Sequence, residues 1–507
     1  MTQILTSLPP LPHATGPYPY VQTPQGAISA GDMAQRVVAV RAGLAGCGAA
    51  PGARVAMQLQ DPLSALAVFY AALGTDLVLV PVHSATPVPE LHHILSDSGA
   101  TMLLTDAPVP DAALPTGTAL QDIGDWQASS ASGETPGPAL NPAPGPDLAA
   151  PAVILYTSGT TGAPKGVVFS HVNLDQIATH FPPQVLDLGP KDTLFLPIEL
   201  NSPIGVVLAV SAHRAGSGLT LAGRSDPARI IDRLREMQVT VMLVVPTLAA
   251  MLIAATRDRP DPLPHLRHMV LGGNPVTRDL AERITSGLGC RLSVVFAMTE
   301  LIPGLILRNR ADQPDGSVGW PAPGLDAEIL GPDGQTVAEG EIGELAVRGA
   351  QLQAGYWRGG GIDPLPGPDG WYRTGDLGYR EAGGNTVLVG RAKDVILTGG
   401  HTVYPPEVEQ TLEQHPDVAR AALVGRSHRD FGEIVVAFVV PRPGSELTEA
   451  ALIRWAKTRL QAAKCPRAVR FIDDMPMTGS GKIRKAALRS GLRNRSDSEE
   501  GQINDSV

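Results

Sequence analysis

Short apolar runs recur along the N-terminal two thirds of the chain and alternate with segments of helical spacing. Residues 31–48 repeat apolar side chains at helical intervals, begin near Asp32, which has the chemistry of a helix cap, and end in glycine. Apolar runs typical of β-strands occur at residues 53–59, 77–82, 151–156, 239–246, 268–273 and 292–298. The last three have no polar face, which is typical of parallel strands buried on both sides. The pattern therefore predicts an α/β fold whose strand ends are the place to look for a ligand site.

The pattern changes after about residue 340. Short runs with intervening turns at 342–349, 371–380 and 385–400 predict antiparallel strands. A compact α+β segment follows, with helices expected at 405–416 and 448–463 and strands at 419–425 and 433–441. Residues 124–148 are rich in proline, alanine, serine and glycine and predict a surface loop. The polar segment 493–507 is predicted to be disordered.

Composition supports a globular protein with more than one domain. The chain has 507 residues, 43% of them hydrophobic and 18% charged. Its net charge of −10 argues against nucleic acid or an anionic membrane as the main partner. Cys47, Cys290 and Cys465 lack metal-type spacing and predict reduced thiols. With no signal-like N-terminus and no run long enough to span a bilayer, the sequence predicts a cytoplasmic protein without an integral membrane segment.

The segment "YTSGTTGAPKG" (156–166) follows an apolar strand and has the composition of a phosphate-binding loop. It does not fit the GxxxxGK[ST] pattern, since proline precedes the lysine and glycine follows it. Backbone N–H groups in such a loop form an anion nest, and the hydroxyls and the lysine add donors. The residues concerned are Thr157, Ser158, Gly159, Thr160, Thr161, Gly162 and Lys165. Taken alone, the segment is weak evidence for binding, because glycine and threonine are also ordinary turn residues.

Three further segments carry chemistry. "VVFAMTE" ends in Thr299 and Glu300, which are either a helix cap with a first-turn acid or a phosphate hydroxyl with a Mg²⁺ carboxylate. Asp376 in "YRTGDLG" and Arg391 in "GRAKD" follow strand-like runs and are either turn and surface residues or ligands of a ribose diol. Lys482 in "GSGKIRK" is either a surface lysine or a fixed charge on a glycine-rich loop.

In order and spacing, "YTSGTTGAPKG", "FAMTE", "YRTGD", "GRAKDVILTGG" and "GKIRK" resemble the adenylate-forming superfamily of acyl-CoA synthetases, peptide-synthetase adenylation domains and beetle luciferases. The resemblance extends from about residue 30 to 490 and its combination of motifs is very specific. It implies a large α/β N-terminal domain, with parallel-type sheets and a small β-barrel, followed by a small mobile α+β domain. The bounds expected from it are 1–391 for the adenylation domain, 392–394 for a hinge, 395–490 for the mobile domain and 491–507 for a disordered tail.

The resemblance also implies a role for each matched residue. The loop from Thr157 to Lys165 would cover the β- and γ-phosphates of ATP. Thr299 would bind the α-phosphate, Glu300 the Mg²⁺, and Lys482 both the substrate carboxylate and the α-phosphate. The other matched positions are Gly272, Gly273, Asn274, Phe296 and Ala297 beside the adenine and acyl group, Asp376 and Arg391 on the ribose, Lys393 at the hinge, and Gly399, Gly400 and His401 facing CoA.

The activity implied is an ATP-dependent acyl-CoA ligase that forms acyl-AMP and pyrophosphate and then a CoA thioester. Its substrates would be ATP, CoA and a small carboxylic acid, with Mg²⁺ as the metal and no nucleic acid. The first alternative is a free-standing adenylation enzyme that loads an acyl or amino acid onto an acyl carrier protein or another nucleophile. A ligand-binding relative without activity and a generic nucleotide triphosphatase that releases ADP are the other two. No signal of oligomeric state is present in the sequence.

Three departures from the family pattern concern the acyl site. Ala297 stands where a glycine is usual, and Thr402 where an asparagine is usual. The segment "LPIELNSPIG" (196–205) lacks the usual aromatic residue and histidine and brings in Glu199 and Asn201. These changes indicate either local drift on a loop or a polar or amino-bearing acyl substrate. The candidate acyl pocket comprises Glu199, Asn201, Ala297 and Met298.

Overall fold

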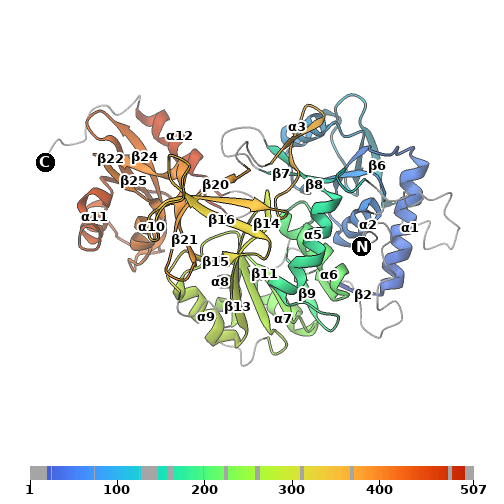
Figure 1. Ribbon diagram of the computed structural model, residues 1–507, viewed down its shortest axis with the longest axis horizontal. Helices are drawn as coiled ribbons and strands as arrows, with labels where there is room; N and C mark the ends of the chain where they lie inside the picture. Colours follow the sequence, from blue (N-terminus) through green and yellow to red (C-terminus); the bar gives the residue numbers. More distant parts are fainter. Residues whose placement is uncertain are drawn as a thin grey trace. The chain divides into compact units, whose positions relative to one another are not determined.

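The structure is a computed structural model in which the chain forms two compact units (Figure 1). The first unit comprises residues 1–327 and 347–372, and the second comprises 328–346 and 373–507. Each unit is described by itself. The structure describes residues 20–23, 26–73, 75–124, 126, 147–157, 164–197, 199–221, 227–256, 263–308, 313–365, 370–477 and 482–496.

One sheet of the first unit is mainly parallel. Its strands, in spatial order, are β15 (Ser317–Pro321), β14 (Leu301–Arg308), β13 (Arg291–Met298), β12 (His268–Gly272), β11 (Val241–Val244), β9 (Thr193–Leu196), β10 (Gly218–Leu221), β1 (Val21–Thr23) and β2 (Gly26–Ile28). Neighbours from β13 to β1 pair in parallel, whereas β14, β15 and β2 are antiparallel. Parallel pairing places the carboxyl ends of β9, β11, β12 and β13 at one edge of the sheet.

Both faces of this sheet are buried, as the continuous apolar runs predict. In β9, Leu194 belongs to one core cluster and its neighbour Phe195 to the other. The same alternation holds in β11, where Val241 and Met242 take opposite sides. The helices packed around these clusters are α5 (His171–Phe181) and α6 (Pro203–Ala215) on one side and α7 (Pro227–Glu236), α8 (Pro246–Thr256) and α9 (Arg278–Leu288) on the other.

The second sheet of the first unit carries the segment that precedes the predicted phosphate loop. Its strands, in spatial order, are β19 (Gly361–Pro364), β18 (Gly355–Arg358), β8 (Lys165–Ser170), β7 (Pro151–Thr157), β4 (Val78–Pro81), β3 (Arg54–Gln58), β5 (Met102–Thr105) and β6 (Ala119–Asp122). Strands from β7 to β6 pair in parallel, and β8, β18 and β19 are antiparallel. The accompanying helices are α1 (Ala30–Gly46), α2 (Pro62–Leu73) and α3 (Val88–Ser98).

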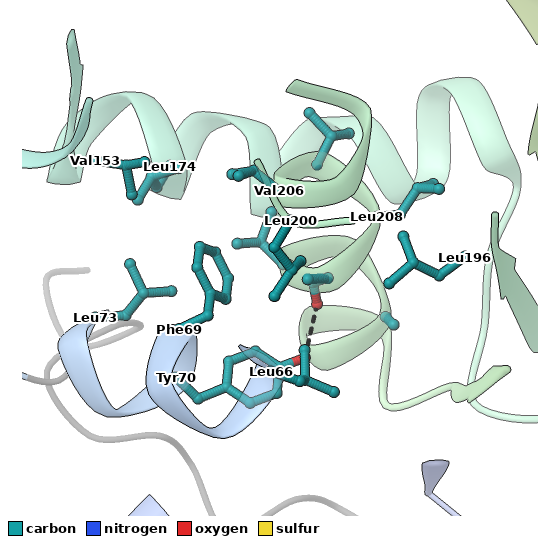
Figure 2. Packing of buried hydrophobic residues seen from close by; sticks show 14 of the residues in the cluster. Leu66, Phe69, Tyr70, Leu73, Val153, Leu174, Leu196, Leu200, Val206 and Leu208 are labelled. Carbon is teal, nitrogen blue, oxygen red and sulfur yellow. Dashed lines mark hydrogen bonds between the residues drawn. The ribbon is translucent and has the colours of Figure 1, made fainter. Parts of the chain in front are cut away.

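Helices α2, α5 and α6 join the two sheets through a common core (Figure 2). Phe69 of α2 and Leu174 of α5 are fully buried there and point toward Val206 of α6. The hydroxyl of Tyr70 donates a hydrogen bond of 3.0 Å to the carbonyl of Ala209, which satisfies the polar end of a buried aromatic ring. Because interiors are close-packed, deleting the Phe69 ring would cost about 3–5 kcal/mol. This core fixes the relative position of the two sheets, and therefore of the strand ends that carry the candidate site.

The second unit has a run of strands and a compact α+β part. Strands β16 (Leu325–Leu330), β17 (Gly343–Gly349), β20 (Tyr372–Arg380) and β21 (Thr386–Arg391), where the small barrel is expected, pair in that order. The boundary between the units passes through β16 and β17. The α+β part contains β22 (Ile396–Thr398), β23 (His401–Val403), β24 (Val418–His428), β25 (Gly432–Pro441), β26 (Ala468–Phe471), α10 (Pro405–Glu413), α11 (Glu449–Lys457) and α12 (Lys485–Ser496).

Three local expectations differ from the structure. Helix α1 is capped by Ser29, while Asp32 is the third helical residue and its carboxylate accepts a hydrogen bond from the backbone N–H of Ser29. The acid therefore completes a capping box instead of starting the helix. Helix α11 ends at Lys457, six residues before the predicted end at 463, and α12 continues to Ser496, into the segment expected to be disordered. Most of the loop predicted at 124–148 lies outside the described residues.

Candidate active site

The carboxyl ends of β12 and β13 bring two predicted motifs together. Gly272 pairs with Val295 across the two strands, so Gly273 leaves β12 next to Phe296, from which β13 continues to Met298. Burial decreases at this point: Val295 is 4% exposed, whereas each residue from Phe296 to Glu300 is partly exposed. Side chains at the end of β13 can therefore contact both the core and a ligand.

The glycines of "LGGNP" are required by the local backbone. Gly273 has a φ of +87°, a conformation that side chains disfavour, and it turns the chain away at the end of β12. At Gly272 a Cβ would lie 3.1 Å from Cγ1 of Val295, which is tighter than ordinary packing. The partly exposed Asn274 follows directly and lies at the same edge.

Thr299 and Glu300 form the turn between the antiparallel strands β13 and β14, and do not begin a helix. The interpretation of these residues as a helix cap is therefore wrong. The carboxylate of Glu300 accepts a hydrogen bond of 2.8 Å from the hydroxyl of Tyr356 on β18. That hydroxyl also lies 3.3 Å from the hydroxyl of Tyr372. Burial raises the pKa of Tyr356 to about 12, with Tyr372 opposing the shift and Glu300 adding to it, so Tyr356 is a phenol at neutral pH.

The two ends of the predicted phosphate loop are held by a β-ladder. Thr157, the last residue of β7, lies directly opposite Lys165, the first residue of β8. The Lys165 side chain is exposed, with Nζ 6.0 Å from the ring centroid of Tyr356. The loop positions Ser158, Gly159, Thr160, Thr161 and Gly162 lie outside the described residues.

Helix α3 supports the base of this loop. Nε2 of His93 lies 3.3 Å from the carbonyl oxygen of Pro164, and the hydroxyl of Tyr156 donates a hydrogen bond of 2.6 Å to Asp97. Burial, together with Asp97, raises the pKa of Tyr156. Sequence reasoning missed His93, Asp97 and Tyr356. Their partners are 56 to 71 positions away along the chain, so no local motif marks them.

In the second unit, Asp376 and Arg391 are opposite each other on β20 and β21. Nε of Arg391 lies 2.9 Å from one carboxylate oxygen of Asp376, and its NH2 nitrogen lies 3.3 Å from the other. Burial raises the pKa of Asp376, and the positive charges of Arg391 and then Lys482 oppose the shift. The structure thus groups three residues predicted to contact the nucleotide.

Lys482 and Lys393 are both exposed and both act electrostatically on Asp376. Desolvation lowers the pKa of Lys393, and the neighbouring Asp394 opposes this effect. Arg489 of α12 forms an ion pair of 2.9 Å with Asp394, which ties the predicted hinge segment to the last helix.

Gly399 and Gly400 form the two-residue turn of the β22–β23 hairpin. Their φ values of +55° and +80° are those that such tight hairpin turns require. The N–H of Gly399 donates a hydrogen bond of 2.8 Å to the carbonyl of Phe431. His401 and Thr402 begin β23 with exposed side chains, so this turn presents small and polar groups at a surface of the second unit.

Glu199 and Asn201 lie just after β9, at the edge of the sheet that carries Glu300. Two strands separate β9 from β13, a distance of about 14 Å at normal strand spacing. The Glu199 carboxylate accepts hydrogen bonds from the backbone N–H of Ser84 at 3.1 Å and its hydroxyl at 2.8 Å, and His83 lies 3.7 Å away. Ser84 follows β4 of the other sheet, so Glu199 connects the ends of two sheets.

A cavity of about 140 Å³ opens at the carboxyl ends of β3 and β5. Gln58, Ser84 and Thr105 contribute polar groups to it, and none of the predicted site residues lines it. Within the described ranges, no group of three or more His, Cys, Asp or Glu side chains is arranged to hold a metal ion, and no helix is long and apolar enough to cross a bilayer.

Comparison with known proteins connects both units to described families. Residues 15–357 match the model of the "AMP-binding enzyme" family, and residues 407–482 match the "AMP-binding enzyme C-terminal domain". A feruloyl-CoA synthase from Amycolatopsis sp. is 32% identical over 484 residues, covering 94% of this chain and 96% of that protein. A fatty acid–[acyl-carrier-protein] ligase, ScoC of Streptomyces coeruleorubidus, is 31% identical over 468 residues, covering 88% of each chain.

Among solved structures, ATP-bound MatB from Rhodopseudomonas palustris is similar, with a TM-score of 0.87 and 28% identity. The match covers 97% of this chain and 99% of that one. The similarity therefore includes most of both units.

Proposed function

The chain belongs to the AMP-binding enzyme family, and from this we infer that it joins a carboxylic acid to the thiol of CoA in an ATP-dependent reaction. The chain is an AMP-forming acid–thiol ligase that makes an acyl-AMP as its intermediate. The observation that carries this function is the extent of the similarity to a CoA ligase, 94% of the chain, together with a C-terminal family match that reaches Lys482.

In the first step a carboxylate oxygen attacks the α-phosphorus of ATP, the bond from that phosphorus to the bridging oxygen breaks, and pyrophosphate leaves. Two anions must meet, so the protein contributes mainly by positioning the groups and stabilising their charge. We assign Lys482 to the approaching carboxylate and the α-phosphate, and Thr299 to the α-phosphate. We propose that the loop between Thr157 and Lys165 covers the leaving pyrophosphate. The pairing of these two residues at the base of the loop supports this role.

The residues at the β13–β14 turn fit a magnesium ion bound together with ATP. Mg²⁺ is usually held by one or two carboxylates plus substrate phosphates, and not by an all-protein cage. Glu300 supplies one partly exposed carboxylate at the site edge, and only one of its oxygens accepts the Tyr356 hydroxyl. When bound there, the metal would neutralise negative charge on the phosphates. This donor set agrees with the absence of larger ligand clusters among the described residues.

For the nucleoside, we propose that Asp376 and Arg391 hold the ribose hydroxyls while Phe296 and the 272–274 turn lie beside adenine and the acyl group. A carboxylate that remains ionised can accept hydrogen bonds from both hydroxyls of a diol. The positive charges of Arg391 and Lys482 favour that state against the effect of burial on the pKa of Asp376.

In the second step the CoA sulfur attacks the acyl carbonyl carbon, the bond to the phosphate oxygen breaks, and AMP leaves as the thioester forms. We assign the Gly399–Gly400 turn and His401 to the side that faces CoA. The double-glycine turn has no side chain that would obstruct a thin pantetheine arm.

Of the expected acyl-pocket residues Glu199, Asn201, Ala297 and Met298, Glu199 has a structural role in the first unit. Its carboxylate already accepts two hydrogen bonds from Ser84, so it holds the loop after β4 in place. We propose that the partly exposed Ala297 and Met298 at the end of β13 contact the acyl group.

A panel of carboxylic acids tests the function. It should contain ferulate, indoleacetate, long-chain fatty acids and sulfoacetate, the acids named for similar ligases, and amino-bearing aromatic acids. The purified chain, ATP and Mg²⁺ are incubated with each acid, with and without CoA, and AMP and ADP are separated by chromatography. We expect acid-dependent AMP that increases with CoA, together with an acyl-CoA mass. ADP as the product, or no AMP with any acid, would contradict the proposal.

Loading of an acyl carrier protein is the second candidate function, and the similarity to a fatty acid–[acyl-carrier-protein] ligase favours it. Acid-dependent pyrophosphate exchange does not separate the two, because both begin with acyl-AMP. Product mass with CoA or with a phosphopantetheinylated carrier protein as the only acceptor does separate them.

A further inference from the structure

Glu300 is held by a residue from the other sheet of the first unit. Its turn connects β13 and β14 of the mainly parallel sheet, whereas Tyr356 belongs to β18 of the sheet that carries the loop base. The hydroxyl–carboxylate distance of 2.8 Å is that of a normal O–H···O hydrogen bond. The backbone carbonyl of Glu300 also accepts the N–H of Gln353 at 2.9 Å, so both ends of the residue are fixed from the same segment.

The same tyrosine lies next to the base of the phosphate loop. Tyr356 pairs with Val167 across β18 and β8, two residues after Lys165. The Lys165 Nζ lies 6.0 Å from the Tyr356 ring centroid, within the range of a cation–π contact. Tyr356 thus contacts Glu300 through its hydroxyl and Lys165 through its ring.

We propose that Tyr356 is a positioning residue that fixes the Glu300 carboxylate relative to Lys165, and thereby determines how tightly the metal–triphosphate complex binds. The inference rests on the proposed function, which assigns Glu300 to the metal and Lys165 to the phosphates. A glutamate side chain has three rotatable bonds, so a hydrogen bond to one oxygen reduces the conformations that binding must select. The other carboxylate oxygen would then be available to bind a metal. In many metal sites a hydrogen-bonded neighbour orients the ligand in this way.

The variant Y356F removes the hydroxyl and keeps the ring near Lys165. The Kd of a non-hydrolysable ATP analogue is measured by calorimetry on the full chain, with Mg²⁺ and with EDTA. In the wild-type chain Mg²⁺ should tighten binding. In Y356F the tightening by Mg²⁺ should fall about tenfold or more, the usual effect of losing a partner that orients a metal ligand. Binding in EDTA should change by less than about twofold, because the ring and the loop base remain.

Two further variants make the result specific. Y379F removes a tyrosine hydroxyl on β20 outside this cluster and should leave the Mg²⁺ effect unchanged. In a double-mutant cycle, Y356F combined with E300Q should reduce the Mg²⁺ effect no further than E300Q alone, because Tyr356 acts through Glu300.

The outcomes separate this inference from the proposed function. If Mg²⁺ has no effect on the wild-type chain, the metal assignment of Glu300 is wrong and the inference is wrong with it. If Mg²⁺ tightens binding equally in the wild-type chain and in Y356F, only the role of Tyr356 is wrong. Weaker binding of Y356F in EDTA, or additive effects of Y356F and E300Q, would indicate a merely structural role and would also overturn the inference.

Discussion

The charged neighbours of Lys482 distinguish it from an ordinary surface lysine. In the sequence it follows a glycine-rich segment and resembles many surface lysines. In the structure its charge is close enough to oppose the upward shift in the pKa of Asp376, which faces Arg391. Its exposed amine is therefore in the same cluster as the candidate ribose ligands Asp376 and Arg391.

The variant K482Q should slow acyl-AMP formation by about 10²–10³-fold, since it removes one fixed charge at the step in which two anions meet. Thioester formation from a supplied acyl-AMP should change by less than about tenfold, because no second anion then approaches phosphorus. Stopped-flow or quench measurements of each half-reaction test this prediction. K457Q, at an exposed lysine on α11, is the matched control. Equal losses in both half-reactions would contradict the assigned role.

Tyr356, His93 and Ser84 mark the limit of prediction from sequence for single residues. Tyr356 and Ser84 contact the candidate residues Glu300 and Glu199, and His93 contacts Pro164, next to Lys165, at sequence separations of 56, 115 and 71 positions. By contrast, Asp376, Arg391 and Lys482 could be named from the sequence because a family motif surrounds each one.

At the scale of elements, the apolar patterns predicted the central strands well. The run at 239–246 contains β11, the run at 268–273 contains β12, and the run at 292–298 lies entirely within β13. Each strand is buried on both faces, so a continuous apolar run was sufficient to identify it. Element ends were harder to predict, since the Ser29 cap of α1 depends on backbone geometry that side-chain periodicity does not encode.

The first residue of β12, His268, makes the stability of the first unit sensitive to pH. Its ring nitrogens lie 2.9 Å from the carbonyl of Leu186 and 3.0 Å from the hydroxyl of Ser293. Burial lowers its pKa from 6.5 to about 4. The folded chain therefore keeps a neutral imidazole where the unfolded chain takes up a proton. Stability is full above pH 6.5, decreases as the pH falls, and reaches its lower limit near pH 4.

When the pH falls from 7 to 5, the uptake of a proton by His268 in the unfolded chain should lower the free energy of unfolding by about 2 kcal/mol. H268Q should reduce the difference in melting temperature between the two pH values, because glutamine does not titrate. Differential scanning calorimetry on the full chain measures it. H92Q, at an exposed histidine of α3, should retain the wild-type difference. If the pH dependence of H268Q is unchanged, the effect comes from another group. His213 is one such group, because burial lowers its pKa to about 4 as well.

At the scale of the whole molecule, the same acyl group must react in two steps. It is first joined to the α-phosphate of ATP and then transferred to the CoA thiol. We propose that the segment around Lys393 is the hinge that allows this change. It forms a single turn from Ala392 to Asp394, between the end of β21 and the start of β22. Arg489 contacts both the carbonyl of Lys393 and the carboxylate of Asp394 from α12.

The variant K393P restricts φ and removes an N–H at this position, so it should hinder a backbone rearrangement of the segment. We expect thioester formation to slow by about tenfold or more relative to acyl-AMP formation, since only the second step needs the rearrangement. K393A controls for loss of the charge and should affect the ratio of the two rates little. Comparable rates of both half-reactions in K393P would place the hinge elsewhere.

The sequence by itself determined the fold class and the family, predicted the central strands, and named the charged residues that we propose for the reaction. It could do so because burial requires a periodic apolar pattern, and because the residues within each motif lie close together along the chain. Tertiary structure alone decided that Glu199 binds the loop after β4, that Thr299 and Glu300 form a hairpin turn, and that Tyr356 connects Glu300 to Lys165. The contacts of Glu199 and of Tyr356 with Glu300 join segments from two different sheets, and their geometry depends on how the shared helical core sets those sheets against each other, which no local pattern encodes.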